Sequence, residues 1–207
     1  MSPKVSKEYK EEKKVQLLQA ARKVFIKKGY MHATMQDIMD EAGVSRGALY
    51  DYFNNIEHAF IEVLKFDDQE ILHFFKLDDQ LSIWIQLTKW IKSQQKSIET
   101  INDSLLLARA QFYLSSNYTK DKNNFPYIKE RYQITVKFIN TFIQKGIDKG
   151  EFHPSILPES IARYFISSLN GLMLDTFQLG AEVTSVHDQL ITLIFSLKEM
   201  LCPIENK

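Results

Sequence analysis

Apolar residues recur at helical spacing along almost the whole of this chain of 207 residues. In the first thirty residues they fall at i, i+3 and i+4, which is typical of an amphipathic helix. We expect this helix to begin near Ser6 and to stop at Gly29. Its apolar face consists of Leu17, Leu18, Ala21, Val24 and Phe25.

Two short helices are expected between residues 34 and 53, with a tight turn at Gly43 between them. Thr34 and Ser45 stand where N-cap residues stand, and Asp37 lies at the capping-box distance from Thr34. A helix, a glycine-containing turn and a second helix make up a helix-turn-helix.

Glycine and proline are scarce, with seven and five residues, and neither occurs between Gly47 and Pro126. All-β folds need turn residues at roughly every tenth position, so a sandwich or a barrel is excluded. The predicted fold is all-α, with a three-helix head in residues 1–54 followed by a bundle of about six helices in residues 55–207. The later helices are expected over residues 55–75, 81–98, 103–118, 127–149, 158–179 and 185–201, with a polar loop at 119–124.

The formal net charge is zero, from 26 basic and 26 acidic residues. That sum hides an asymmetry, because residues 1–28 hold nine basic and three acidic side chains, a local charge of +6. The rest of the chain is correspondingly acidic. A neutral total therefore does not argue against a nucleic-acid partner.

Cys202 is the single cysteine, which excludes an intrachain disulfide and favours a reducing compartment. The N-terminal residues lack the apolar core of a signal peptide. An uncharged stretch at residues 164–174 is well below the roughly 20 residues that span a bilayer. We expect a cytoplasmic protein with no membrane partner.

The second helix of the predicted helix-turn-helix has an apolar side and a polar side. Leu49 and Phe53 share the apolar side, which we expect to pack on the two preceding helices. A buried seam opposite a short polar face is what a recognition helix in the major groove requires. For Arg46 alone, a solvated charge at a helix start is the better interpretation. The basic head and the turn glycine, taken with Arg46, favour DNA binding.

Several residue types in this helix suit a phosphate backbone. Ser45 leaves N–H groups exposed at a helix start, which attract anions. Gly47 costs helix stability about 1 kcal/mol relative to Ala but allows a close backbone approach. Tyr50 and Tyr52 offer hydroxyl groups to phosphates, and Arg46 suits either a phosphate or a guanine edge.

Residues 15–60 resemble the DNA-binding domain of the tetracycline-repressor (TetR/AcrR) family of regulators. The resemblance covers about a quarter of the chain, and the remainder resembles the family only in its length and helical character. The matching residues are Ala20, Ala21, Phe25, Gly29, Tyr30, Thr34, Ile38, Ala42, Gly43, Val44, Ser45, Gly47, Leu49, Tyr50, Tyr52 and Phe53.

The resemblance implies a homodimeric repressor that leaves a near-palindromic double-stranded DNA operator when a small-molecule inducer binds. Residues 1–54 would be the DNA-binding domain, and residues 55–207 the ligand-binding and dimerisation domain. By position, Thr34 and Ser45 would cap helices and bond phosphates, and Tyr50 and Tyr52 would brace the DNA backbone. The residues implied to face the bases are Arg46, Gly47, Ala48 and Asp51.

The chain departs from the family pattern at two phosphate-contacting positions. Lysine is usual in the family where this chain has Ile56, and it is frequent where this chain has Asn54. We expect the lysine-rich segment before Val15 to compensate for these two contacts.

The aromatic residues of the second domain favour a ligand pocket between helices. Arg109 is the only charge inside the apolar helix expected over 103–118. A salt bridge to a buried acid explains such a charge, and an anchor for an anionic ligand is the sharper hypothesis. An aromatic-rich core is the alternative for each aromatic candidate. The candidate lining residues, with Arg109, are Trp84, Phe112, Tyr113 and Phe142.

The C-terminal helix expected over 185–201 offers more apolar surface than one neighbour covers. With the helix over 158–179 it is expected to form a four-helix seam with a second copy of the chain. Packing within one chain is the alternative. A dimer would place two recognition helices about 34–36 Å apart, which is one turn of the major groove. The expected seam residues are Phe165, Leu169, Leu172, Met173, Leu190, Ile194 and Leu197.

No sequence pattern supports an enzyme, since a Gly-rich phosphate loop, a Cys/His zinc spacing and a nucleophile elbow are all missing. No metal and no cofactor are therefore expected. The alternative function is a helical small-molecule-binding or interaction protein whose head has weakened or lost DNA binding.

Replacing Lys4, Lys7 and Lys10 by Gln is expected to lower operator affinity, because lysines that meet phosphates release counterions from the DNA. The dependence of affinity on salt concentration should also become less steep. Affinities measured over a salt series test this expectation, and an unchanged slope would contradict a role for the lysine-rich segment.

Overall fold

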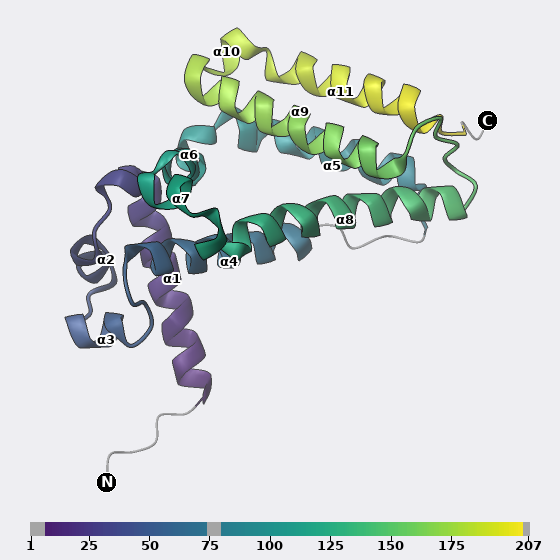
Figure 1. Cartoon of the computed structure of the whole chain (residues 1–207). Helices are drawn as coiled ribbons and strands as arrows, with labels where there is room; N and C mark the ends of the chain where they lie inside the picture. Colours follow the sequence, from purple (N-terminus) through teal and green to yellow (C-terminus); the bar gives the residue numbers. More distant parts are fainter. Residues whose placement is uncertain (1–6, 74–79, 205–207) are drawn as a thin grey trace. The chain divides into compact units, whose positions relative to one another are not determined.

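The computed structural model describes residues 7–73 and 80–204, with the side chains of residues 8–68 and 80–204, and every regular element within them is a helix (Figure 1). The all-α fold expected from the scarcity of glycine and proline is confirmed. Within these ranges, none of the helices combines the length and the hydropathy that a bilayer crossing needs.

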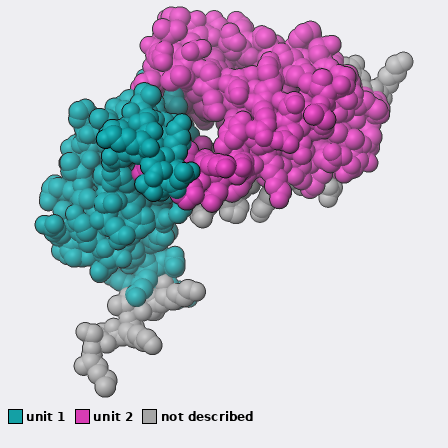
Figure 2. All heavy atoms as spheres, viewed as in Figure 1, with its two compact units in different colours: residues 1–75, 102–124 teal, residues 76–101, 125–207 magenta. Residues whose placement is uncertain are grey.

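The chain forms two compact units, each made of two separate stretches of sequence (Figure 2). Unit 1 comprises residues 1–75 and 102–124, and unit 2 comprises residues 76–101 and 125–207. This division does not coincide with the boundary expected after residue 54, because helix α4 (Ile56–His73) packs along α1 (Lys7–His32) and stays in unit 1. The assignment of separate functions to residues 1–54 and 55–207 stays a prediction.

Helix α1 is the central element of unit 1, since it packs against α2, α4 and α6. Its predicted apolar face is buried throughout, and Leu17, Ala21 and Phe25 are fully enclosed. The short 3₁₀ turn η1 (Ile101–Asp103) lies where the chain enters unit 1 for the second time. The other elements of unit 1 are α1 (Lys7–His32), α2 (Met35–Ala42), α3 (Arg46–Tyr50), α4 (Ile56–His73), α6 (Leu106–Leu114), α7 (Ser116–Lys120) and the 3₁₀ turn η2 (Lys122–Asn124).

An aromatic core joins α1, α4 and α6. The ring of Phe60 lies 4.9 Å from that of Phe25 and 5.1 Å from that of Phe112, and Phe112 lies 5.0 Å from Tyr30. Edge-on and tilted rings at these distances attract one another beyond the effect of burial. Burial, and to a lesser extent the negative charge of Glu57, raises the pKa of Tyr30 to about 12.

Helix α1 is interrupted at Gly29, where the sequence predicts its end. Gly29 has φ 70° and ψ 177°, a conformation that L side chains rarely adopt, and helical structure continues as far as His32. The expected break is confirmed, and a further short stretch of helix follows it.

The third helix is shorter than its sequence pattern suggests. Helix α3 ends at Tyr50 instead of near Phe53. The amides of Tyr52 and Phe53 both donate to the carbonyl of Leu49, each at 3.0 Å, so the chain turns away directly after the helix.

The helix expected over residues 103–118 is divided into α6 and α7 at Ser115. Ser115 has an extended backbone, and its hydroxyl oxygen accepts the amide of Tyr118 at 3.3 Å. Serine favours a cap over a helix interior because its hydroxyl competes for backbone groups. The expected loop at 119–124 accordingly contains the end of α7 and the turn η2.

In unit 2, α5, α9 and α11 pack against one another, and α8 packs against α5 and α9. The ring of Trp90 on α5 meets that of Phe165 on α9 edge to face at 5.7 Å. A carboxylate oxygen of Glu151 accepts the amide of Ile83 at 2.6 Å, which satisfies a donor at the start of α5. The helices of unit 2 are α5 (Ile83–Glu99), α8 (Pro126–Asp148), α9 (Pro158–Leu179), α10 (Ala181–Thr184) and α11 (Val186–Leu201).

Gly146→Ala is expected to destabilise unit 2. A Cβ at residue 146 would lie 2.2 Å from Cδ2 of Phe152, whose side chain is buried and has little room to move. Overpacking of this kind typically lowers the free energy of unfolding by about 1–3 kcal/mol. Chemical denaturation measures the change. Gly171→Ala on α9, where a Cβ meets nothing within 4 Å, is the matched control, and an equal loss in both variants would contradict the explanation.

Candidate nucleic-acid interface

Helix α3 is seated with its apolar side inward and its polar side in solvent. Leu49 and Phe53 are fully buried, as their spacing predicts, and so are Ile38 of α2 and Phe25 of α1. The exposed residues of the segment 45–51 are Ser45, Arg46, Gly47, Tyr50 and Asp51, whereas Ala48 is half-buried.

The turn between α2 and α3 is built as the sequence predicts. Gly43 adopts φ 63° and ψ 38°, a left-handed conformation, and its amide donates to the carbonyl of Met39. Ser45 caps α3 by accepting the amide of Ala48 at 3.4 Å. These two caps fix where α2 ends and where α3 begins.

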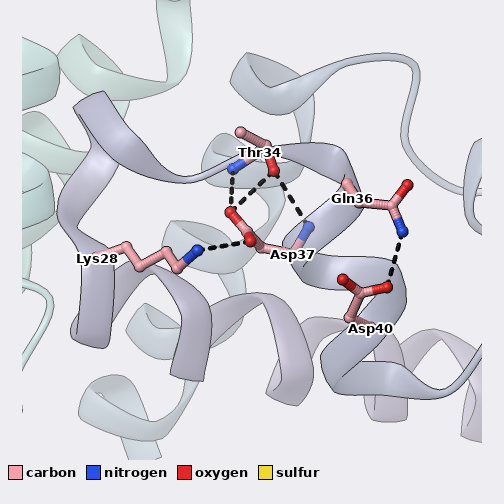
Figure 3. A network of polar contacts seen from close by, with 5 residues as sticks. All are labelled: Lys28, Thr34, Gln36, Asp37 and Asp40. Atoms are coloured by element: carbon pink, nitrogen blue, oxygen red, sulfur yellow. Dashed lines mark hydrogen bonds and ion pairs between the residues drawn. The ribbon is translucent and has the colours of Figure 1, made fainter.

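A polar network holds the start of α2 beside the end of α1 (Figure 3). Thr34 and Asp37 form the predicted capping box, in which the Thr34 amide donates to Asp37 Oδ2 at 3.0 Å and the Asp37 amide donates to Thr34 Oγ1 at 3.2 Å. The ammonium group of Lys28 lies 2.6 Å from Asp37 Oδ1. Hydrogen bonds from Lys28 and then from Thr34 lower the pKa of Asp37. The stabilising contribution of Asp37 is therefore present near neutral pH and is lost as the pH falls through this lowered pKa.

Thr34 acts as a helix cap in this arrangement. Its hydroxyl donates its one hydrogen to Asp37 Oδ2 at 2.8 Å, so the phosphate bond implied by the family resemblance requires that hydrogen to turn away. Lys28, which the sequence shows only as one of nine basic residues, brings a partly exposed cation to the same place. No helical spacing rule finds this lysine, because its contact crosses the break at Gly29.

Arg46 and Tyr50 form a pair on the exposed side of α3. The guanidinium carbon lies 5.2 Å from the centre of the Tyr50 ring, which is a cation–π contact. The contact brings together two of the residues expected to meet DNA.

Gly47 lies between them in open space. A Cβ built on Gly47 meets no heavy atom within 4 Å, so packing within the chain does not require glycine here. Glycine also carries a cost inside a helix. A requirement for glycine at this position would therefore come from a molecule outside the chain.

Tyr52 is placed differently from Tyr50. It is half-buried, and its hydroxyl donates to the carbonyl of Lys10 at 3.5 Å, which connects the end of α3 to α1.

The two positions that depart from the family pattern follow α3. Ile56, at a position where lysine is usual in the family, is half-buried at the start of α4. The amide of Asn54 donates to Nδ1 of His58 at 3.1 Å.

The positive charge of residues 1–28 is partly neutralised by acids elsewhere in unit 1. Residues 1–54 together hold ten basic and seven acidic side chains, so the head carries +3, less than the +6 of its first 28 residues. The side chains of Lys4 and Lys7 lie outside the described residues. The pairs with nitrogen–oxygen distances of 2.6–3.3 Å are Lys14–Glu62, Arg22–Asp67, Lys23–Glu41 and Lys28–Asp37.

The five candidate ligand residues are divided between the two units. Arg109, Phe112 and Tyr113 lie on α6 in unit 1, whereas Trp84 on α5 and Phe142 on α8 lie in unit 2. Phe112 is fully buried in the aromatic core, in agreement with the packing alternative, and Phe142 is also buried. A role for the five residues in binding a ligand stays a prediction.

Unit 2 contains an open groove of about 1050 Å³ where the chain leaves α8 and enters α9, and none of the five candidates lines it. Helical periodicity does not reveal this groove, because an irregular connection forms most of its wall. Among the described residues, no group of three or more His, Cys, Asp or Glu is placed to hold a metal. The groove is lined by Gln144, Ile147, Phe152, His153, Pro154, Ser155, Ile156, Leu157, Pro158 and Ser160.

The seven expected dimer residues are buried to different extents within the single chain. Four are buried, namely Phe165, Leu169, Leu190 and Leu197, and the other three are half-buried, namely Leu172, Met173 and Ile194. The outward apolar side of α11 is formed instead by Ile191 and by Phe195, which is 64% exposed. The interface stays a prediction.

Comparison with known proteins extends the resemblance beyond the head. Residues 17–63 match the bacterial regulatory proteins of the tetR family, and residues 86–187 match the tetracyclin repressor-like C-terminal domain. The uncharacterized HTH-type transcriptional regulator YfiR of Bacillus subtilis (strain 168) is 30% identical over 187 residues, 90% of each chain. This chain belongs to the TetR family of transcriptional regulators.

Other TetR-family proteins resemble it over much of its length. The HTH-type transcriptional repressor KstR2 of Mycolicibacterium smegmatis (strain ATCC 700084 / mc(2)155) is 26% identical over 72% of each chain. A structure described as the SmeT–Triclosan complex has a TM-score of 0.72 at 14% identity and covers 90% of each chain, which shows a shared fold. TetR-family regulators are generally DNA-binding proteins without enzymatic activity.

Gly47→Ala is expected to leave the thermal stability unchanged or slightly raised, because alanine is the better helix former and the added Cβ meets no neighbour. Its affinity for DNA should nevertheless fall, by roughly tenfold if about 1.4 kcal/mol of contact is lost. Fluorescence anisotropy with operator DNA and a thermal melt measure the two effects. An unchanged affinity would show that no DNA backbone approaches Gly47.

Proposed function

We propose that this TetR-family regulator is a ligand-responsive repressor, which binds a near-palindromic operator as a homodimer and leaves it when a small molecule binds. The exposed side of α3 carries this proposal. Arg46, Gly47 and Tyr50 face solvent there, while Leu49 and Phe53 fix the helix from behind. A cation, a position without a side chain and an exposed phenol together suit base edges and phosphates.

Each exposed or half-buried group of this segment has a distinct proposed role. Arg46 reads a guanine edge through its two parallel N–H groups, and Asp51 and Ala48 complete the base-facing set. Tyr50 and Tyr52 brace the DNA backbone, and the cap residues Thr34 and Ser45 bond phosphates. Lys28 adds a phosphate contact at the start of α2, which its partly exposed ammonium group supports.

Dimerisation is supported by the apolar surface that α9 and α11 leave uncovered. Ile191 and Phe195 on α11 and Leu174 on α9 are at least 41% exposed, and the half-buried Leu172, Met173 and Ile194 continue this surface. A second copy would cover such side chains through a two-fold interface. Two heads related by that symmetry read two half-sites, which explains why a near-palindrome is proposed.

The repressor role and the response to a ligand are supported by relatives. KstR2 is described as a repressor, and SmeT is described in complex with triclosan. Trp84 and Phe142 in unit 2, and Arg109, Phe112 and Tyr113 on α6, are the proposed ligand residues. A ligand shifts the equilibrium between two forms of a protein only by the difference between its affinities for them. An inducer must therefore bind more tightly to the form that does not bind DNA.

Selection of bound sites from random DNA by the full chain tests the proposal. The expected result is a near-palindromic site, with two half-sites whose centres are about one helical turn apart or a multiple of it. Arg46→Ala should relax the preference at one base pair in each half-site, at a cost of about 1–3 kcal/mol. Arg163→Ala, which removes an exposed arginine of α9, is the matched control.

The alternative function gives a different result in the same experiment. A helical binding or interaction protein that has lost DNA binding would enrich no sequence from the random pool. Light scattering on the same preparation reports the dimer, and a screen for small molecules that release the selected DNA tests the response to a ligand.

A further inference from the structure

A side chain from α6 bridges the break in α1. The backbone of Gly29 is not helical, so α1 is interrupted two residues before Met31. The amide of Met31 donates to Oε1 of Gln111, 80 residues further along the chain, at 3.1 Å. A backbone donor just after the break is therefore bound by a side chain from another helix.

Gln111 also lies directly against Gly29. A Cβ built on Gly29 would be 2.3 Å from Oε1 and 3.0 Å from the amide carbon of Gln111. The positive φ requires glycine at residue 29, and the Gln111 amide lies in the space directly beside it.

Two adjacent residues of α6 hold the segment that leads into the helix-turn-helix. Gln111 binds the backbone of Met31, and the ring of Phe112 lies 5.0 Å from that of Tyr30. Thr34, the N-cap of α2, follows Met31 by only three residues. The position of Gln111 therefore constrains where α2 begins and, through the turn at Gly43, where α3 lies.

The stretch that carries Gln111 is joined to unit 2 at both ends. Residues 102–124 pack in unit 1, but residues 76–101 before them and 125–207 after them belong to unit 2. A rearrangement of unit 2 that displaces either end of this stretch acts on α6. The hydrogen bond from Met31 is a place where that displacement reaches the head.

We propose that Gln111 is a positioning residue for DNA binding, which holds the start of α2 through its bond to the Met31 amide and so links operator affinity to the stretch 102–124. This inference rests on the proposed function, because it takes operator DNA to be the ligand of the head. Gln111 itself touches no DNA in this proposal.

Two substitutions with side chains as long as glutamine distinguish the effect of the hydrogen bond from the effect of side-chain size. Gln111→Met fills the same space without an oxygen acceptor, whereas Gln111→Glu keeps an acceptor oxygen for the Met31 amide. Hydrogen exchange of that amide should accelerate in Gln111→Met and stay slow in Gln111→Glu. Affinity for DNA selected by the wild-type chain should fall about two- to tenfold in Gln111→Met, the range expected for one hydrogen bond, and be retained in Gln111→Glu.

Gln133→Met, at an exposed position of α8, is the matched control and should bind DNA as the wild type does. If Gln111→Met unfolds, Gln111→Asn replaces it, since the shorter side chain keeps the amide but draws it back from Met31. Wild-type affinity in the acceptor-free variant, or an equal loss in Gln111→Glu, would overturn the inference and leave the proposed function standing. If the wild-type chain selects no DNA, the proposed function itself fails and the inference fails with it.

Discussion

A helix of five residues has no stability of its own in water, and the DNA-facing side of this protein depends on that constraint. Helix α3 exists because Leu49 and Phe53 are buried beneath it and because Gly43 and Ser45 fix its start. Every group that α3 presents to solvent is consequently placed by packing on the opposite side. That packing reaches from α3 through α2 to α1, and from α1 to α4 and α6.

The electrostatics of the head are more restrained than its lysine content suggests. Four of the basic residues in the first 28 pair with carboxylates of α2 and α4, and partly exposed pairs of this kind contribute little to stability. Their greater effect is on orientation. Lys28 is aimed at the start of α2 by Asp37, and Arg46 lies over the ring of Tyr50. Ordered cations lose less freedom on meeting a phosphate than mobile ones do.

Local chemistry made much of the head predictable from the sequence. Capping by Thr34 and Asp37, the left-handed turn at Gly43 and the burial of Leu49 all follow from rules that act within a few residues. Side-chain contacts between different helices were not predictable. No periodicity indicates that Gln111 meets Gly29 or that Lys28 meets Asp37, and the division at Ser115 depends on a single hydroxyl group. The groove in unit 2 likewise arises from an irregular connection, and such connections carry no periodic signal.

The interleaved order of the two units has a consequence for protein engineering. A fragment that ended at residue 75 would contain the whole helix-turn-helix and α4, yet it would lack α6 and leave the rings of Tyr30 and Phe60 without Phe112. Apolar surface uncovered in this way favours aggregation. A chimaera that transplants this head onto another regulator would therefore need two grafts, residues 1–75 and residues 102–124, exchanged together. Recombination between relatives at a single crossover within residues 76–101 would also separate these two stretches. Residues 1–75 and 102–124 are therefore expected to be inherited together.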